Sequence, residues 1–350
     1  MELDAGLDAA LAAAAAAALP PLGQAGLLAG IHSVSERYTT ARERLLLGAP
    51  DTPAERAARA LFFLPADLCK VHVPLAELAA AGALPTASPL SILDLGCGLG
   101  TQSIGALAYL RGAAHITLRD RDPAALALAA ILTRAAADHL GLRCNIDTRT
   151  VDLSAPSIQG RYDLILLGTT LNELHLDRRD PIAARGALLC TLGGRLSDQG
   201  ALIVIEPALR DTARALEELR EHVDLTIFAP CTHARRCPAL AEARDFCHED
   251  RPFRAPPRLA RLIQASGLRE HGLKFSYLTL RRAPGRRSDG ARVVSAPLCS
   301  KGKTEWFVCS AEGRVRLRVL DRDRDPLART LDRGDNLENG RRNPRAPVDS

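Results

Sequence analysis

Short apolar runs alternate with helical segments through the middle of the chain. There are five of these runs: SILDL, which begins at residue 91, HITLRD, a run that ends in TVDL, YDLILLG and ALIVIEP. The segments between them place apolar residues three or four positions apart, as the buried face of a helix requires. Strands that alternate with helices are typical of βαβ units. The pattern therefore predicts a parallel, doubly wound α/β sheet.

The segments on either side of this alternation have other patterns. The first 85 residues predict helices, two of them over 33–47 and 53–81. After a helix near 211–222 the chain is irregular and rich in Cys and His; periodicity then returns with a helix at 258–266 and strands at 273–281, 292–296, 305–309 and 314–320. The predicted organisation is a helical cap (1–85), a Rossmann-like core (86–228), a Cys-rich insert (229–257), the end of the core with a small C-terminal β addition (258–331) and a disordered basic tail (332–350).

Composition and charge refine this division. Aromatic residues make up only 3% of the chain, so the core must be built from Leu, Ala, Val and Ile, which suits helices packed on a parallel sheet. The net charge is +5, but residues 281–350 contain 17 Lys and Arg against 10 Asp and Glu. The basic character therefore lies at the C-terminal end. Such an end indicates either a phosphate-backbone partner or a solubilising tail.

The alanine-rich N-terminal segment does not have the pattern of a targeting peptide. Residues 1–30 contain no Lys or Arg and do contain Glu2, Asp4 and Asp8, which argues against a secretory signal and an arginine-rich presequence. No apolar stretch approaches the ~20 residues of a membrane span. We therefore expect a cytoplasmic protein, in which the nine cysteines stay reduced.

A glycine-rich turn follows the first predicted strand. Asp94 ends the apolar run, and Gly96, Gly98 and Gly100 lie between it and the next helix. Glycine lets the backbone turn sharply and approach a ligand closely. Asp120 ends the next strand, at roughly the ~20-residue spacing from which a carboxylate reaches a ribose. The GxGxG form, with the acidic Asp94 at the end of the preceding strand, favours an S-adenosylmethionine (SAM) site over a dinucleotide site. Asp152 follows the third strand and is a further cofactor candidate.

Polar residues also follow the fourth strand. Gly168 ends that strand, and Asn172 and Glu173 come directly after it, at the sheet edge where α/β proteins bind ligands. The two side chains could orient a methyl acceptor or the methionine part of SAM. They could equally be solvated residues at a helix start, where Asn and Glu are common. Glu206 after the fifth strand allows the same two readings.

Three cysteines lie close together in the irregular insert. Cys231, Cys237 and Cys247 are separated by five and nine residues, and Cys309 or Cys299 could supply a fourth thiolate. A metal can unite thiolates in a loop that lacks an apolar core. The spacing is compatible with an iron–sulfur cluster, with a zinc site to which His233 and His248 could contribute, or with scattered free thiols. The remaining cysteines read as small core or loop residues.

Several strings together resemble one family. In chain order they are SERY (35–38), DLGCGLGT (94–101), LNEL (171–174), IEP (205–207), APCTHARRCP (229–238), DFCHED (245–250), VCSAEG (308–313) and RGD (333–335). They resemble the Rsm-type small ribosomal subunit methyltransferase-like proteins, which are class I SAM-dependent methyltransferases with mitochondrial and bacterial members. The resemblance implies a 4Fe–4S cluster on Cys231, Cys237, Cys247 and Cys309. It also implies a role in maturation or assembly of the small ribosomal subunit.

Three functions are compatible with these features. The primary hypothesis is a SAM-dependent methyltransferase that acts on ribosomal RNA (rRNA) of the small subunit, as a monomer and without a membrane. In that case catalysis would come mainly from positioning the acceptor. The second is a non-catalytic ribosome-assembly factor that keeps the scaffold and binds RNA. The third is a small-molecule methyltransferase whose cysteines are incidental.

Overall fold

The central sheet is mainly parallel. The computed structural model describes residues 1–42, 50–154, 156–269, 272–283, 290–323, 325 and 330–337. In this part of the chain the strand order is β3-β2-β1-β4-β5-β8-β6, with β7 also paired to β8. The strands are β1 (Leu90–Leu95), β2 (Ala114–Asp120), β3 (Cys144–Thr150), β4 (Tyr162–Gly168), β5 (Leu196–Pro207), β6 (Thr226–Ala229), β7 (Glu249–Arg251) and β8 (Leu273–Arg281).

The direction of β8 defines the fold class. Strands β1 to β5 pair in parallel, whereas β8 runs antiparallel to both β5 and β6. The dinucleotide-binding order 3-2-1-4-5-6 has no such inserted strand. The sheet is therefore a Rossmann-like sheet of the methyltransferase type, as the sequence predicted. The pattern missed β6, because its four residues are too few to display a period.

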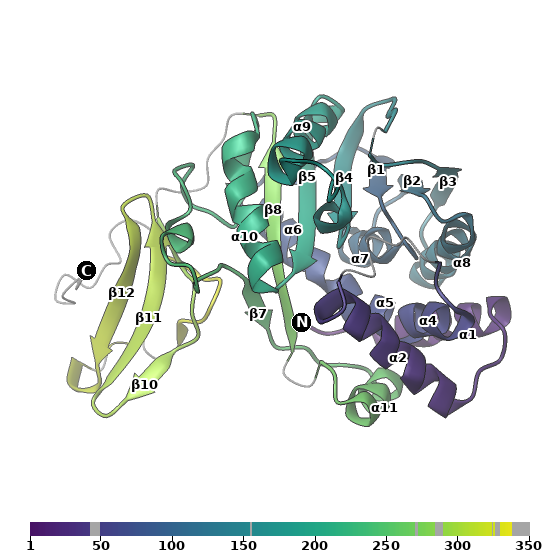
Figure 1. The fold of residues 1–350 in the computed structure, drawn as a ribbon, viewed down its shortest axis with the longest axis horizontal. Coiled ribbons are helices and arrows are strands. Elements are labelled where there is room, and N and C mark those ends of the chain that lie inside the picture. Colours follow the sequence, from purple (N-terminus) through teal and green to yellow (C-terminus); the bar gives the residue numbers. More distant parts are fainter. Residues whose placement is uncertain are drawn as a thin grey trace.

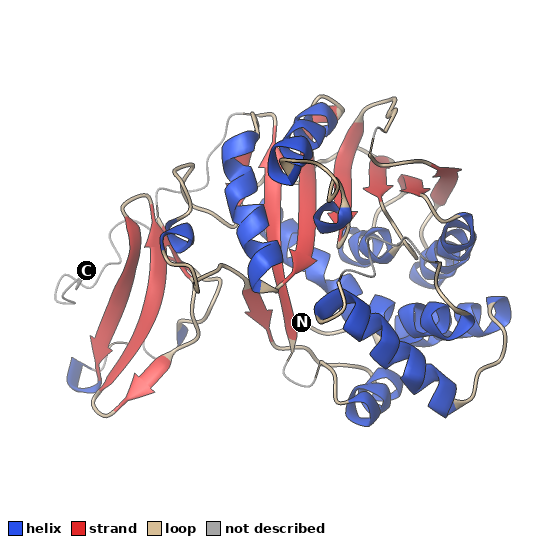
Figure 2. Ribbon diagram, in the orientation of Figure 1, coloured by secondary structure: helices blue, strands red, loops and turns tan. Residues whose placement is uncertain are grey.

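Both faces of the sheet are covered by helices, which explains the continuous apolar runs. Along β1, β4 and β5 alternate residues enter two separate cores, as a two-residue period requires. One core contains Ile92 and Leu164, and the other contains Leu93 and Ile165. The first core is closed by α7 (Thr101–Leu110), α8 (Pro123–Leu140) and the N-terminal helices, and the second by α9 (Pro181–Gly193) and α10 (Arg210–Leu219). Figure 2 shows these layers of helices and strands.

The N-terminal cap is helical but broken. It contains α1 (Ala5–Ala18), α2 (Gln24–Thr39), α4 (Pro53–Ala58), the π-helix η1 (Arg59–Phe63), α5 (Leu64–Asp67), the 3-10 helix η2 (Leu68–Val71) and α6 (His72–Ala80). The predicted helix over 33–47 ends at Thr39, and residues 43–49 lie outside the described residues. In Figure 1 the cap, coloured purple to blue, lies at the lower right of the sheet. No helix among the described residues is long and apolar enough to cross a membrane.

A proline explains why the predicted helix over 53–81 is broken. Pro65 has no N–H, so the carbonyl of Leu61, four residues earlier, loses its helical donor. The helix widens into η1 just before this proline. Arg258 of α11 (Pro257–Ser266) donates to the Leu61 carbonyl at 2.8 Å and pairs with the buried Asp8 of α1. Arg258 thereby joins α11 to both the broken turn and α1 of the cap.

A second, antiparallel sheet follows the core. It contains β9 (Ala291–Val293), β10 (Leu298–Ser300), β11 (Lys303–Ser310), β12 (Gly313–Leu320) and β13 (Asn336–Leu337), with β11 paired to β9, β10 and β12. Figure 1 places this sheet at the end of the molecule opposite the cap. Its small core surrounds Trp306, whose Nε1 donates to the Leu331 carbonyl at 3.2 Å.

The predicted start of the disordered tail at residue 332 was too early. Residues 332–337 make a turn and β13, which pairs with β9. The reason is that Leu331 and Leu337 are both buried in the core around Trp306. The backbone N–H of Asp332 also donates to the Asp335 carboxylate at 2.8 Å. Residues 338–350 lie outside the described residues.

Candidate cofactor cavity and cysteine pocket

The glycine turn after β1 needs each of its glycines for a different reason. Gly96, Gly98 and Gly100 have φ of +64°, +52° and +81°, where other residues are strained. A Cβ on Gly96 would lie 2.2 Å from Cγ2 of Thr170, and one on Gly100 would lie 2.9 Å from Oγ1 of Thr133. Gly98 has no atom within 4 Å of that position and opens onto free space. The turn is thus packed on two sides and open on the third.

The open side faces a cavity of about 940 Å³. Ligand pockets commonly measure about 300–1,000 Å³. The cavity lies between the carboxyl ends of the strands and the cap, at the position where doubly wound sheets bind ligands. Of the residues proposed from the sequence, Asp94, Gly96, Gly98, Asp120, Asp152, Gly168 and Glu173 line this cavity. Gly100 packs on α8 instead, and Asn172 is turned away.

Asp94 presents a buried oxygen without a partner. Its Oδ2 accepts hydrogen bonds from the backbone N–H of Ser103 at 3.1 Å and from the Ser103 hydroxyl at 2.8 Å. Its Oδ1 is buried and has no hydrogen-bond donor. Burial raises the pKa of Asp94 to about 7. A buried polar atom normally has a partner, so this oxygen fits a cationic or N–H-bearing ligand group.

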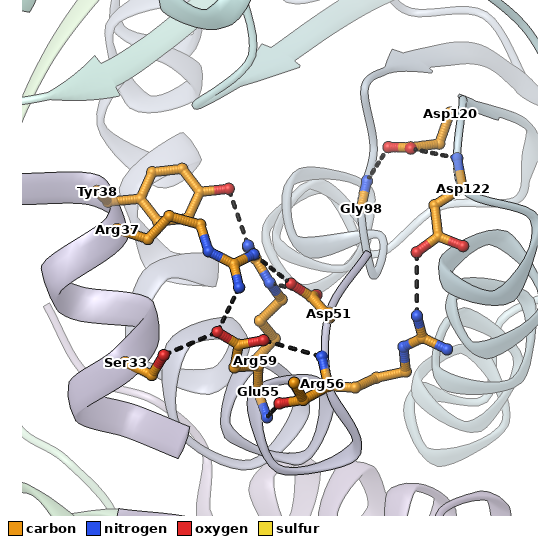
Figure 3. A network of polar contacts seen from close by, with 11 residues as sticks. Ser33, Arg37, Tyr38, Asp51, Glu55, Arg56, Arg59, Gly98, Asp120 and Asp122 are labelled. Atoms are coloured by element: carbon orange, nitrogen blue, oxygen red, sulfur yellow. Dashed lines mark hydrogen bonds and ion pairs between the residues drawn. The ribbon is translucent and has the colours of Figure 1, made fainter. Parts of the chain in front are cut away.

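Asp120 connects the glycine turn to β2 and to the cap. Its carboxylate accepts from the backbone N–H of Gly98 at 2.8 Å and from that of Asp122 at 3.0 Å. Asp122 begins α8 and pairs with Arg56 of the cap at 3.1 Å (Figure 3). Asp152 is exposed, and the backbone hydrogen bond from Ser154 lowers its pKa. One face of the cavity is therefore acidic and fixed by backbone donors.

The opposite wall brings cap residues against Glu173. Arg59 donates to the Tyr38 hydroxyl at 2.9 Å, stands 5.0 Å from the centre of its ring and pairs with Asp51 at 2.6 Å (Figure 3). Burial raises the pKa of Glu173, and the positive charge of Arg59 opposes this shift. Sequence reasoning did not assign Tyr38 or Arg59. The only signal was that Tyr38 ends the string SERY.

Asn172 does not line the large cavity and instead bonds the buried Glu206. Its backbone N–H donates to the carboxylate of Glu206 at 3.1 Å, and its side-chain amide donates to the other oxygen. Its own side-chain oxygen accepts from Arg42 at 2.5 Å. Burial raises the pKa of Glu206 to about 8. Of the two predicted acceptor-binding residues, only Glu173 reaches the cavity.

The cysteines of the insert meet the cysteine of β11 in a second, smaller pocket. Cys231, Cys237, Cys247 and Cys309 all line this cavity of about 50 Å³. The Cys309 sulfur lies 3.5 Å from Nε2 of His233. Cys299 is exposed on β10 and does not line the pocket. In the described part of the chain, no three His, Cys, Asp or Glu side chains are arranged to hold a metal ion.

The four thiols are partly or fully buried among both arginine and glutamate side chains. Burial raises the pKa of each, that of Cys237 to about 11 and that of Cys309 to about 12. Burial lowers the pKa of Arg220, whereas the negative charge of neighbouring thiolates raises it. The net result is a raised pKa. The thiols are therefore protonated at neutral pH unless a cation draws off their protons.

Arginines replace the missing apolar core of the insert. Arg214 of α10 donates to the carbonyls of Glu242 and Asp245 at 2.8 Å, and Arg220 donates to the carbonyl of His233 at 2.9 Å. Backbone carbonyls that no strand or helix uses thus gain charged donors. The loop is shaped by these contacts with α10 and the short helix after it.

Buried ion pairs fasten the second sheet to the core. Arg292 of β9 pairs at 2.6 Å with Glu77 of α6 and at 2.6 Å with Glu249 of β7, and donates to the Tyr277 hydroxyl at 3.2 Å. Arg314 of β12 pairs with Asp245 of the insert. The pocket thus lies where the core, the insert and the second sheet meet.

Comparisons with known proteins agree with the resemblance seen in the sequence. The sequence model of one family, described as "Mitochondrial small ribosomal subunit Rsm22", matches residues 53–341. No curated protein matches the chain.

Solved structures resemble the chain only distantly. They include TehB from Haemophilus influenzae (16% identity, 59% of this chain and 62% of that one, TM-score 0.35) and TrmN from Thermus thermophilus (16%, 60% and 48%, 0.35). A third is the N-methyltransferase NodS from Bradyrhizobium japonicum WM9 (14%, 71% and 100%, 0.40), which was solved with S-adenosyl-L-homocysteine. The chain spans less than two thirds of TehB and TrmN. With TM-scores of 0.40 or below, these likenesses say nothing about its ligand.

Proposed function

This chain belongs to the Rsm22 family, and we propose that it is a SAM-binding protein that acts on the RNA of the small ribosomal subunit. The observation that carries the proposal is the cavity at the glycine turn, because Gly98 leaves space at the turn and Asp94, whose buried Oδ1 has no partner, lines the cavity. We propose the small ribosomal subunit as the target because the description of the family names it.

The cavity residues fit the parts of SAM. Asp120 ends β2 and Asp152 lies in the loop just after β3, where carboxylates can bind ribose hydroxyls. Gly96 and Gly98 allow the backbone to approach the nucleoside. When bound, SAM supplies an electrophilic methyl group on a positively charged sulfur. Glu173 and Tyr38 line the wall across the cavity and would orient the acceptor.

Binding of the cofactor can be tested directly. Titration calorimetry of the purified chain with S-adenosyl-L-homocysteine (SAH) should give one site per chain. The variant Gly98→Val, which puts a branched side chain into the open side of the turn, should abolish the heat of binding. A wild-type chain that shows no binding would refute the proposal.

The position of Asn172 favours a second function, that of a non-catalytic assembly factor. Its amide is committed to the buried Glu206, so one of the two predicted acceptor ligands is absent from the cavity. Incubation with SAM labelled on the methyl group and with small-subunit particles separates the two functions. Label in rRNA that disappears in Glu173→Gln supports transfer. SAH binding with no label in RNA supports the assembly factor, and label only in low-molecular-weight material supports a small-molecule methyltransferase.

We further propose a 4Fe–4S cluster on Cys231, Cys237, Cys247 and Cys309, as the family resemblance implies. Four buried thiols that share one pocket beside Arg220 and Arg314 support it, because these arginines offset thiolate charge. Four thiolates can hold either an iron–sulfur cluster or a single zinc ion, so zinc is the alternative that metal analysis must exclude.

Metal analysis of anaerobically purified protein tests the cluster. Iron and acid-labile sulfide in equal amounts, about four of each per chain, are expected. Stoichiometric zinc without sulfide, or neither metal, would contradict the cluster. The cysteines do not depend on the cofactor cavity, so this result leaves the SAM proposal untouched.

RNA contact is proposed for the outer face of the second sheet. Arg316 and Arg318 alternate along β12 on the side away from Trp306, and Arg316 stands 5.3 Å from the ring centre of Phe307. Arginine and aromatic side chains on a sheet face suit phosphate and base contacts. Replacing both arginines by Ala should reduce the salt dependence of rRNA binding by about two phosphate contacts. If the slope of rRNA affinity against salt concentration is unchanged, the RNA contacts another surface of the protein.

Two expectations from the sequence stay predictions. A monomer is expected, and light scattering after size exclusion would test it. A cytoplasmic location is also expected, although the family description names the mitochondrial ribosome, and fractionation of cells that express the full protein would decide between the two compartments.

A further inference from the structure

Arg220 carries two buried nitrogens whose N–H groups have no oxygen or nitrogen acceptor. It begins the 3-10 helix η4 (Arg220–His222), directly after α10, and is only 7% exposed. Its Nη2 donates to the carbonyls of His233 and Arg235 at 2.9 Å each, whereas Nε and Nη1 find no such acceptor among the described residues. A buried donor normally has a partner. These N–H groups can therefore bind a group that the polypeptide does not supply.

Arg220 lies against the four thiols of the cysteine pocket. It lines the pocket of about 50 Å³ together with all of them, and its guanidinium forms a hydrogen bond with the Cys237 thiol. The charges of three of the four cysteines raise the pKa of Arg220, namely those of Cys231, Cys237 and Cys309. The carbonyls that Nη2 binds belong to the loop between Cys231 and Cys237. The insert thus fixes one nitrogen of the guanidinium and leaves the other two for sulfur.

The charge of Arg220 is not cancelled by a carboxylate. The other two arginines near the thiols, Arg292 and Arg314, each form ion pairs with acidic side chains. Two acids line the pocket: Glu249, which pairs with Arg292 at 2.6 Å, and Glu217, whose pKa burial raises to about 7. No carboxylate of the described residues forms an ion pair with Arg220, whose nitrogens have the contacts given above. The pocket therefore contains a buried positive charge in search of a negative partner.

A metal centre held by four thiolates would carry the complementary charge. Four thiolates bring four negative charges, whereas an oxidised 4Fe–4S core or a zinc ion brings two positive charges. The surplus negative charge is spread over sulfur atoms, which accept hydrogen bonds from N–H groups. A buried charge without a partner is costly. The guanidinium and the centre would therefore each lower the cost of burying the other.

We infer that Arg220 is the counter-ion of the proposed cluster and donates hydrogen bonds from Nε and Nη1 to its sulfur atoms. The inference rests on the cluster proposed above and assigns a role to a residue that is not a ligand. Positive charge and hydrogen bonds to sulfur both stabilise the reduced form of a cluster. Arg220 therefore raises the reduction potential, whereas a residue that only shapes the loop would leave the potential unchanged.

Two variants separate the charge of Arg220 from its contacts with the loop. Arg220→Lys keeps the charge, and Arg220→Gln keeps an N–H donor for the loop carbonyls but has no charge. Iron and sulfide are measured in each anaerobically purified chain, and the reduction potential is measured by a titration followed by electron paramagnetic resonance (EPR). At the wild-type midpoint, the ratio of reduced to oxidised cluster should fall about tenfold or more in Arg220→Gln. The fall should be smaller in Arg220→Lys.

Arg214→Gln is the matched control. Arg214 of α10 also donates to carbonyls of the insert, those of Glu242 and Asp245, but it does not line the pocket. Its replacement should leave the reduction potential unchanged. If Arg220→Gln holds a cluster with the wild-type potential, the inference is wrong.

A measurement on the wild type keeps the test decisive if the variants do not fold or do not hold iron. The chain is labelled with nitrogen-15 in its arginines only, the cluster is reduced, and its magnetic coupling to the label is measured by pulsed EPR. A hydrogen bond transmits unpaired spin from sulfur to nitrogen, so a coupling is expected. Its absence, or its persistence in Arg220→Lys, would overturn the inference. A wild type without iron and sulfide would instead show that the proposed cluster itself fails.

Discussion

The two cavities of this protein are built in opposite ways. Most polar groups around the glycine turn already have protein partners, as Asp120 does with two backbone N–H groups. In the cysteine pocket the four thiols are held near each other by burial and by arginines that bind the surrounding backbone. The first is a hydrogen-bonded cavity, which we propose holds SAM. The second is a set of neighbouring thiols, which we propose holds a metal centre.

Because of this difference, loss of the bound group should affect the two cavities differently. If the proposed groups are bound, removing SAM from the large cavity should leave a hydrogen-bonded shell in place, whereas removing the cluster from the small pocket should leave four protonated thiols. Changes to one cavity should therefore not affect the other.

The largest effect is expected from Cys247→Ser. Serine keeps the size of the side chain and the backbone N–H that Glu217 binds, but its hydroxyl stays protonated and ligates iron poorly. Iron and sulfide should fall to background while the affinity for SAH stays within about twofold. The control is Cys299→Ser, since that thiol is exposed on β10. Retention of the full iron content in Cys247→Ser would show that this sulfur is not a ligand.

Gly96→Ala should have the next largest effect. The added Cβ would lie 2.2 Å from the Thr170 methyl group at a φ of +64°, so turn and β4 must move apart. We expect SAH affinity to fall at least about tenfold, with partial recovery in Gly96→Ala/Thr170→Ser. Gly82→Ala is the control, because its φ is +62° and no atom lies within 4 Å. If both alanine variants bind SAH equally well, the close contact with Thr170 is unimportant.

A smaller effect is expected from pH. The pKa of Asp94 is raised to about 7 in the free protein, and a cationic ligand group beside Oδ1 stabilises the ionised form. The charge is present above pH 7 and is lost as pH falls through 7. SAH affinity should therefore rise about tenfold between pH 6 and pH 7.5, with proton release visible in buffers of different ionisation enthalpy. Asp94→Asn should remove the pH dependence; a dependence that persists there belongs to another group.

The smallest effect is expected from Arg56→Met. The pair between Arg56 and Asp122 joins the cap to α8, but both side chains are partly exposed, at 20% and 30%. Pairs in such positions contribute up to about 1 kcal/mol. Urea unfolding should show a loss within that range and an unchanged iron content. A loss several times larger would mean that cap and core are held together chiefly at this point.

Much of the fold could be predicted from the sequence, because a strand that is buried on both faces appears as a continuous run of apolar residues. β8 was predicted at its observed bounds, and the glycine turn was placed correctly between β1 and α7. Pro and Gly punctuation was visible in 53–81, but neither the π-helix before Pro65 nor the distant Arg258 that binds the Leu61 carbonyl could be read from the sequence.

The candidate sites were predictable only in part. Residues adjacent in sequence to strand ends, such as Asp94 and Asp120, reach the cavity because the topology of the sheet brings them there. Tyr38, Arg59 and Lys70 reach it through the packing of the cap, and no period in the sequence reports that packing. For the same reason Asn172 and Glu173 were indistinguishable, although one faces Glu206 and the other the cavity.

The buried Arg292 has a consequence for how this chain can be divided. It neutralises acidic side chains from α6 and from β7 at once, so a fragment that stops before β9 would carry surplus negative charge into its own interior. The C-terminal sheet is therefore no detachable appendage. A shortened version would first require a residue at position 77 that needs no counter-charge, whereas Glu249 would keep its pair with Arg251 at 2.9 Å.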